Sequence, residues 1–161
     1  MDEILELLSD NARLTPQDIA KLTGKKVEEI KKAIQQYEKS GIIVKYKTLI
    51  NDDLARVKDS FVQALIEVSV SPQKDLGFDS VAERIYSFPE VKSCYLLSGT
   101  YDLLVVVEGE NIQTVASFVA SKLAPIEAVR RTTTHFLLKK YKEDGQILKK
   151  ANHRKRLNIS Y

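Results

Sequence analysis

Apolar residues recur every three or four positions through the first forty residues of the chain, which is the spacing of helices that bury one face. Residues 4–8 carry the first such face, and Asn11 suits the end of that helix. Thr15 then offers an N-cap, followed by a proline at the first helical position and by Asp18, which can complete a capping box. Gly24 fits the end of this second helix.

A third helix is predicted over residues 27–40, where one apolar stripe recurs at helical steps, and Gly41 closes it. Residues 42–47 (IIVKYK) alternate and are rich in β-branched side chains, so we expect a strand there. Three short helices with a glycine-containing turn between the second and third, followed by a strand, are typical of a winged helix-turn-helix.

The remainder of the chain alternates between strand and helix patterns. Residues 51–58 (NDDLARVK) are polar and are expected to form a linker. The later elements are, in order, a strand at 61–70, a loop at 72–77, a helix at 78–88, strands at 91–97 and 103–107, a helix at 112–123 and a long strand at 129–141. The order β-α-β-β-α-β predicts a ferredoxin-like unit and an α+β fold class for the whole chain.

In a ferredoxin-like unit both helices cover the same face of the sheet. The strands LLVVV and FVQALIEV are more apolar than a half-exposed sheet requires. We therefore expect a second subunit to cover the other face, which makes the protein at least a dimer.

Composition agrees with an ordinary globular protein: of 161 residues, 43% are hydrophobic and 29% are charged. No apolar run approaches the roughly 18 residues of a membrane span, and the first residues are acidic and amphipathic, unlike a signal peptide. We expect a cytoplasmic protein that does not contact membranes. The single cysteine, Cys94, cannot form an intrachain disulfide and is expected to be a buried small hydrophobe.

Motifs of enzymes are missing from the sequence. It has no P-loop, no G-x-G-x-x-G, no H-E-x-x-H and no cysteine pair, so we expect neither an enzyme nor a cofactor or metal. Of its two histidines, His135 falls in the last predicted strand and His153 near the C-terminus. A strand histidine is more often a hydrogen-bonded structural residue than a base.

Two stretches resemble the Lrp/AsnC family of bacterial and archaeal transcriptional regulators, also called feast/famine regulatory proteins. They are ILELLSDNARLTPQDIAKLTG with YEKSGII, and FPEVKSCYLLSGTYDLLVVVEG with RTTTHFLLKKYKEDG. The likeness covers residues 3–144, and its most specific part is Ser98-Gly99-x-Tyr101-Asp102. It implies C-terminal domains paired through their sheets, dimers that often form octamers, peripheral domains that bind double-stranded DNA, and amino-acid effectors between C-terminal domains.

With that resemblance the chain divides into four parts. We expect a winged helix-turn-helix DNA-binding domain at 1–50, a linker at 51–60, a ferredoxin-like effector-binding and oligomerisation domain at 61–144, and a basic tail at 145–161. Net charge is uneven: +1 over residues 1–51, −4 over 52–138 and +6 over 139–161. The basic tail could bind phosphates, improve solubility or lie on a neighbouring subunit.

Candidate DNA contacts lie on the polar face of the third predicted helix, because the second helix of a helix-turn-helix enters the major groove. Lysines there can contact phosphates, and glutamines can bond adenine with two hydrogen bonds. The alternative is that this face is only solvated. The candidates are Lys25, Lys26, Lys31, Lys32, Gln35 and Gln36.

Candidate effector contacts lie in the loop before residue 103 and on the last strand. Asp102 can hold an ammonium group, and backbone N–H groups near Gly99 can meet a carboxylate. The alternative is a tight turn in which Asp102 caps its own backbone, with threonines that are ordinary strand formers. The candidates are Ser98, Gly99, Tyr101, Asp102, Thr132 and Thr134.

Two other functions remain open at the level of sequence. A small-metabolite sensor or oligomerisation module that binds no DNA would explain the weak +1 charge of residues 1–51. Some proteins that resemble this family act as haem-pathway decarboxylases, and His135 is the residue that such a reaction would use. A visible absorption band on mixing with a tetrapyrrole would distinguish that enzyme.

Overall fold

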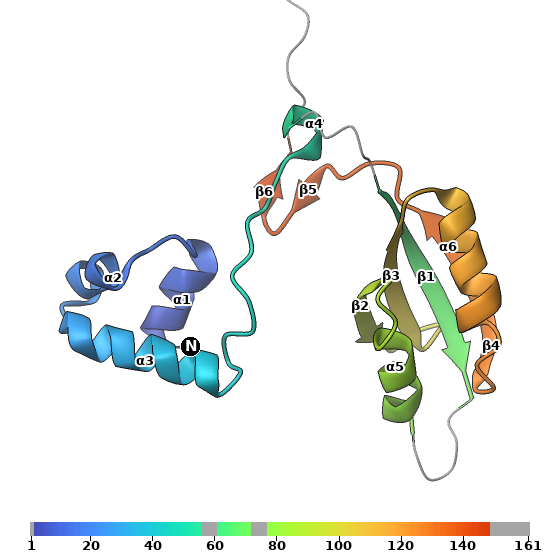
Figure 1. Cartoon of the computed structure of the whole chain (residues 1–161), viewed down its shortest axis with the longest axis horizontal. Helices are drawn as coiled ribbons and strands as arrows, with labels where there is room; N and C mark the ends of the chain where they lie inside the picture. The colour runs from blue at the N-terminus through green and yellow to red at the C-terminus, as the bar shows by residue number, and fades with distance from the viewer. Residues whose placement is uncertain (1, 56–60, 72–76, 149–161) are drawn as a thin grey trace, which may run out of the picture. The chain divides into compact units, whose positions relative to one another are not determined.

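A computed structural model describes residues 2–55, 61–71 and 77–148 of the chain (Figure 1). It divides into two compact units, Met1–Ile50 and Asn51–Tyr161. No helix in these ranges is long and apolar enough to cross a membrane. Residues 72–76 of the predicted loop at 72–77, part of the linker and the tail from residue 149 lie outside the described residues.

The first unit consists of three helices, as the apolar spacing predicts: α1 (Glu3–Asp10), α2 (Pro16–Thr23) and α3 (Val27–Lys39). The predicted capping box at the start of α2 is present, with Thr15 and Asp18 each accepting the other's backbone N–H. Gly24 ends α2 with φ 71°, a left-handed conformation that suits glycine. The core is apolar and consists of Ile4, Leu8, Ile19, Ala20 and Ile30.

The strand predicted at residues 42–47 is wrong, because this segment has no strand structure. A strand needs a neighbouring strand to pair its backbone N–H and C=O groups, and the first unit offers no partner within the described residues. Ile43 packs against the helical core, whereas the side chain of Val44 is 89% exposed. The alternation therefore marks an extended segment. Beyond it, a short helix, α4 (Asp52–Ala55), lies within the predicted linker.

The second unit is built on a four-stranded antiparallel sheet of order β2-β3-β1-β4. Its strands and helices, in chain order, are β1 (Val62–Val70), α5 (Asp79–Tyr86), β2 (Val91–Leu96), β3 (Leu103–Gly109), α6 (Ile112–Phe118), the π-helix η1 (Val119–Leu123) and β4 (Val129–Phe136). Figure 1 shows α5 and α6 on the same side of the sheet. The predicted ferredoxin-like order is confirmed.

Alternation along the strands separates a buried face from an open one. Under the helices lie the buried cross-strand pairs Ile66↔Val105 and Val68↔Leu103. The opposite face carries Leu65 beside Val106, both only half-buried, and Tyr95, which is 52% exposed. This open face is the one that we expected a second subunit to cover.

The last predicted strand is too long: β4 ends at Phe136, not at residue 141. Phe136 pairs with Ala64, and the N–H of Leu137 donates to the carbonyl of Gln63 at the start of β1. This is close to the first residue of β1, Val62, and beyond it the side chain of Leu138 is 94% exposed.

A small hairpin that we had not predicted follows β4. Its strands are β5 (Lys142–Glu143) and β6 (Gln146–Ile147), joined by Asp144 and Gly145. Both of these residues have positive φ, of 45° and 76°. An Asp-Gly pair with positive φ at both positions is the commonest signal of a two-residue hairpin turn, so the sequence did contain the information.

Candidate nucleic-acid interface and effector loop

Helix α3 is fixed by one apolar stripe that faces the other two helices. Ile30 is fully buried, and Val27, Ile34 and Tyr37 pack around it. Tyr37 also meets the carboxylate of Asp2, and burial together with this hydrogen bond raises the pKa of its phenol. The remaining faces of α3 are left to solvent.

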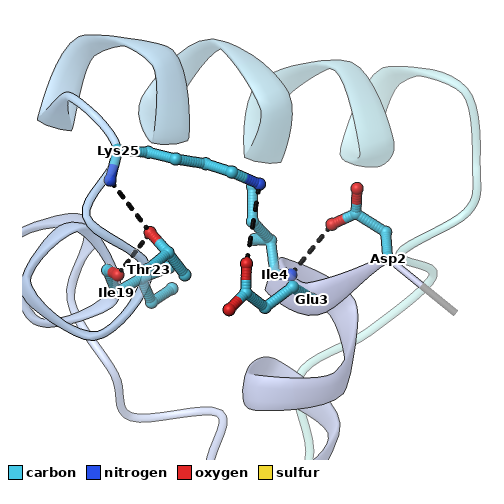
Figure 2. A network of polar contacts seen from close by, with 6 residues as sticks. All are labelled: Asp2, Glu3, Ile4, Ile19, Thr23 and Lys25. Carbon is cyan, nitrogen blue, oxygen red and sulfur yellow. Dashed lines mark hydrogen bonds and ion pairs between the residues drawn. The ribbon is translucent and has the colours of Figure 1, made fainter.

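A network of polar contacts holds the turn between α2 and α3 against the start of α1 (Figure 2). Lys25 Nζ lies 3.8 Å from Glu3 Oε2, and the Lys25 backbone N–H donates to Thr23 Oγ1 at 3.4 Å. Thr23 Oγ1 in turn donates to the carbonyl of Ile19 at 2.9 Å, and the N–H of Ile4 donates to Asp2 Oδ1 at 2.8 Å. Lys25 therefore links the turn before α3 to the start of α1, a contact that its position in the sequence does not reveal.

The six DNA-contact candidates divide by their bonds within the chain. Lys31 pairs with Glu28 at 3.0 Å, one helical turn back. Lys25 is engaged as above. Among the described residues no hydrogen bond or ion pair involves the exposed side chains of Lys26, Lys32, Gln35 and Gln36. These four polar groups are available to an external partner.

The effector-loop candidate Asp102 is tied to β1. Its Oδ2 accepts the backbone N–H of Val70 at 2.8 Å, and its own N–H donates to the carbonyl of Val68 at 3.1 Å. The Asp102 carbonyl also accepts the N–H of Leu97 at 2.8 Å, which closes the loop between β2 and β3. The Asp102 carboxylate thus caps the backbone of another strand, whereas the alternative interpretation placed it on the backbone of its own turn. The partners are main-chain atoms of Val68 and Val70, which side-chain patterns could not identify.

The other loop candidates form the outer part of the same turn. Ser98 and Gly99 are exposed, and a side chain built on Gly99 would meet nothing within 4 Å. Tyr101 is half-buried. The space beside the loop is therefore open to a small molecule.

Thr132 and Thr134 lie on β4, across β1 from the loop. Thr132 pairs with Val68 and Thr134 with Ile66, so both threonines are on the helix-covered side of the sheet and are half-buried. Leu103, next to Asp102, flanks the other side of Val68. Val68 of β1 therefore has Thr132 on one side and Leu103, the residue after Asp102, on the other. Thr134 lies two residues farther along β4, away from the loop.

His135 lies on the open face of the sheet. Its Nε2 is 3.1 Å from Glu67 Oε1 on the adjacent strand, and its side chain is 53% exposed. The described residues contain no cluster of three or more potential metal ligands. His135 is thus hydrogen-bonded within the sheet, as expected for a structural strand histidine.

Two family models match the chain over its two units. Residues 3–44 match a winged helix-turn-helix DNA-binding domain, and residues 63–147 match the Lrp/AsnC ligand binding domain. The second match spans more than half of the chain and includes the hairpin of β5 and β6.

Known proteins are similar to this chain over nearly its whole length. An uncharacterised HTH-type transcriptional regulator of Bacillus subtilis, YugG, is 46% identical over 159 residues, 98% of this chain and 95% of that protein. The structure of E. coli AsnC aligns with TM-score 0.62 and 25% identity, covering 86% and 89% of the two chains. A Neisseria meningitidis transcriptional regulator in complex with L-Met aligns with TM-score 0.63 and 26% identity, covering 88% and 89%. The chain belongs to the Lrp/AsnC family of transcriptional regulators.

Proposed function

We propose that this protein regulates transcription by inserting α3 into the major groove of double-stranded DNA, as a homodimer whose C-terminal domains bind an amino acid. The observation that carries the DNA-binding part is the outward face of α3. Lys32, Gln35 and Gln36 are exposed there and have no partners among the residues that the structure describes, on a helix that follows a capped α2 and a glycine turn. Lysine meets phosphate and glutamine meets adenine.

The test is fluorescence anisotropy with labelled DNA from upstream of the protein's own gene, at two salt concentrations. Lys32→Ala should weaken binding to all sequences and reduce the slope of log K against log salt by about 0.9, the value for one lost phosphate contact. Arg84→Ala, which removes one positive charge from exposed α5, is the matched control and should leave the slope unchanged.

An absence of binding to this DNA and to unrelated DNA at low salt would contradict the proposal. It would leave the metabolite sensor that binds no DNA as the better function. Equal losses from Lys32→Ala and Arg84→Ala would contradict the placement of the interface on α3.

For the effector we propose an α-amino acid held at the loop of Ser98, Gly99, Tyr101 and Asp102, with Thr132 and Thr134 nearby. One carboxylate oxygen of Asp102 accepts the backbone N–H of Val70, and no hydrogen bond to its second oxygen occurs among the described residues. That oxygen can accept from an ammonium group while open space beside Gly99 admits the carboxylate. The L-Met complex of the Neisseria relative supports an amino acid as the ligand class.

Asp102→Asn separates the two roles of this side chain. The amide oxygen can still accept from Val70, so the thermal stability should change little, whereas the negative charge that attracts an ammonium group is lost. Calorimetric titration with each amino acid should then show binding to the parent protein and at least tenfold weaker binding to the variant. Unchanged affinity in Asp102→Asn would place the effector elsewhere.

The dimer is proposed to form through the open face of the sheet, where Leu65, Val106 and Tyr95 are incompletely covered by the single chain. A dimer is the smallest assembly that buries this face, and an octamer is the larger assembly that the family resemblance suggests. Pairing would place two α3 helices on one dimer, and two weak contacts with the same DNA molecule then give a higher overall affinity than either alone.

A further inference from the structure

Helix α3 contains three glutamates, and only one of them lacks a partner within ranges 2–55, 61–71 and 77–148. The carboxylate of Glu28 pairs with Lys31 at 3.0 Å, and the carboxylate of Glu38 accepts the hydroxyl of Tyr46 at 3.0 Å. The side chain of Glu29 is exposed, and no hydrogen bond or ion pair involves it within the described part of the chain.

The position of Glu29 places it among the polar groups that face outward. Lys32 and Gln36 follow it at three and seven residues, so the three side chains form one continuous ridge of the helix. The neighbouring residue Ile30 lies on the core side of the helix and is buried. Glu29 also lies in the first turn of α3, and the N-terminal residues of a recognition helix are those that meet base edges.

A carboxylate at this place constrains the DNA that the helix can approach. Phosphates repel it, so a glutamate facing the groove weakens binding unless a hydrogen-bond donor meets it. Guanine presents only acceptors in the major groove, and thymine presents an acceptor and a methyl group. Adenine presents a donor beside the acceptor N7, whereas cytosine presents the N4 amino group alone. Cytosine is therefore the base that suits an unpaired carboxylate.

We infer that Glu29 accepts a hydrogen bond from the N4 amino group of a cytosine in the DNA site and rejects guanine and thymine at that position. The inference rests on the proposed function, because it assigns a base to the same helix. A glutamate in the first turn also stabilises a helix through its dipole, but Glu28 and Glu29 share that effect equally. Of these two, only Glu29 has a carboxylate without a partner in the part of the chain that the structure describes.

The first experiment is selection of binding sites from a random duplex pool with the full chain. The parent protein, Glu29→Ala and Asp10→Asn are compared. Asp10 is an exposed acidic residue at the end of α1, so its substitution removes the same charge from the same unit but not from α3. The expected result is one position at which cytosine is enriched by the parent and by Asp10→Asn, and at which Glu29→Ala shows no preference.

The second experiment replaces that cytosine by N4-methylcytosine, whose methyl group takes the place of the N–H in the major groove while base pairing is kept. Affinity of the parent should fall about tenfold, and affinity of Glu29→Ala by less than twofold. Circular dichroism of Glu29→Ala checks that the helices are intact.

The outcomes distinguish this inference from the proposed function. If the parent protein selects no sequence and binds no DNA, the proposed function fails. If it selects a site and Glu29→Ala selects the same site with the same preference, DNA binding stands and the role of Glu29 is refuted. A loss of the cytosine preference in Asp10→Asn as well would show an effect of net charge and would equally refute it.

Discussion

At the scale of single residues, an ion pair joins the start of β2 to η1. The carboxylate of Glu90 bonds Lys122, whose ammonium also lies 5.7 Å above the ring of Phe88. The hydrogen bond from Lys122 holds the pKa of Glu90 below its ordinary value of 4.5, and the opposing effect of burial is smaller. The pair therefore favours the ionised carboxylate in the folded protein.

This pair makes the stability of the second unit depend on pH. Because the pKa of Glu90 is lower in the folded than in the unfolded chain, its contribution is complete above pH 4.5 and is lost as pH falls through the folded value. Glu90→Gln should be less stable than the parent at pH 7, and the difference should shrink below pH 4.5. Urea unfolding at both pH values measures it. A difference that is the same at pH 7 and below the folded pKa would show that the charge contributes nothing.

The candidate site shows how far residues can be predicted one at a time. The polar face of α3 follows from helical spacing, which identified four of the six candidate residues within α3 and the two lysines just before it. Which lysines are free was not predictable, because Lys25 pairs with Glu3 from a different helix. Likewise the carboxylate of Asp102 accepts a hydrogen bond from Val70 of β1, a residue 32 positions away along the chain. Spacing predicts a face, but only the fold assigns its partners.

At the scale of elements, the start of α2 is specified by its own side chains. Thr15 Oγ1 accepts the N–H of Asp18 at 3.2 Å, and Asp18 Oδ2 accepts the N–H of Thr15 at 3.1 Å. Thr15→Ala removes one of these caps and should destabilise the first unit by about 1 kcal/mol. Amide hydrogen exchange in α2 measures the loss. Thr48→Ala, at an exposed position outside any helix or strand, is the control and should leave exchange unchanged.

Helices proved easier to predict than strands, for a physical reason. A helix forms its backbone hydrogen bonds between residues close in sequence, so caps such as Thr15 and Gly24 can be predicted from the sequence. A strand depends on a neighbour. Residues 42–47 alternate like a strand but form none among the described residues, and β4 ends at Phe136, close to the start of β1. Both segments do show apolar alternation, but neighbouring residues in the sequence do not indicate which strand, if any, will pair with them.

At the scale of the whole molecule, the two units carry separate tasks that only assembly can join. The first unit has a small core of buried residues around Ile30 and exposes the α3 ridge; the second has the larger core and the open sheet face. A single α3 with a few free polar groups contacts few phosphates. In the proposed dimer, the open face would bring two copies of the first unit to one DNA molecule and so raise the affinity.

Val106→Glu tests that requirement, because it places a charge in the middle of the open face opposite Leu65. The buried side of β3 is untouched, so each chain should still fold. Light scattering should show a monomer, since an unpaired charge at the centre of an interface is strongly unfavourable. Affinity for DNA should fall by about a hundredfold or more although α3 is unchanged, which is the usual gain from linking two sites.

Gln113→Glu adds the same charge at an exposed position on α6 and should alter neither the mass in solution nor the affinity for DNA. If Val106→Glu kept the parent's mass in solution, the open face would not be the subunit interface. If it became a monomer with undiminished affinity, a single α3 would suffice for binding.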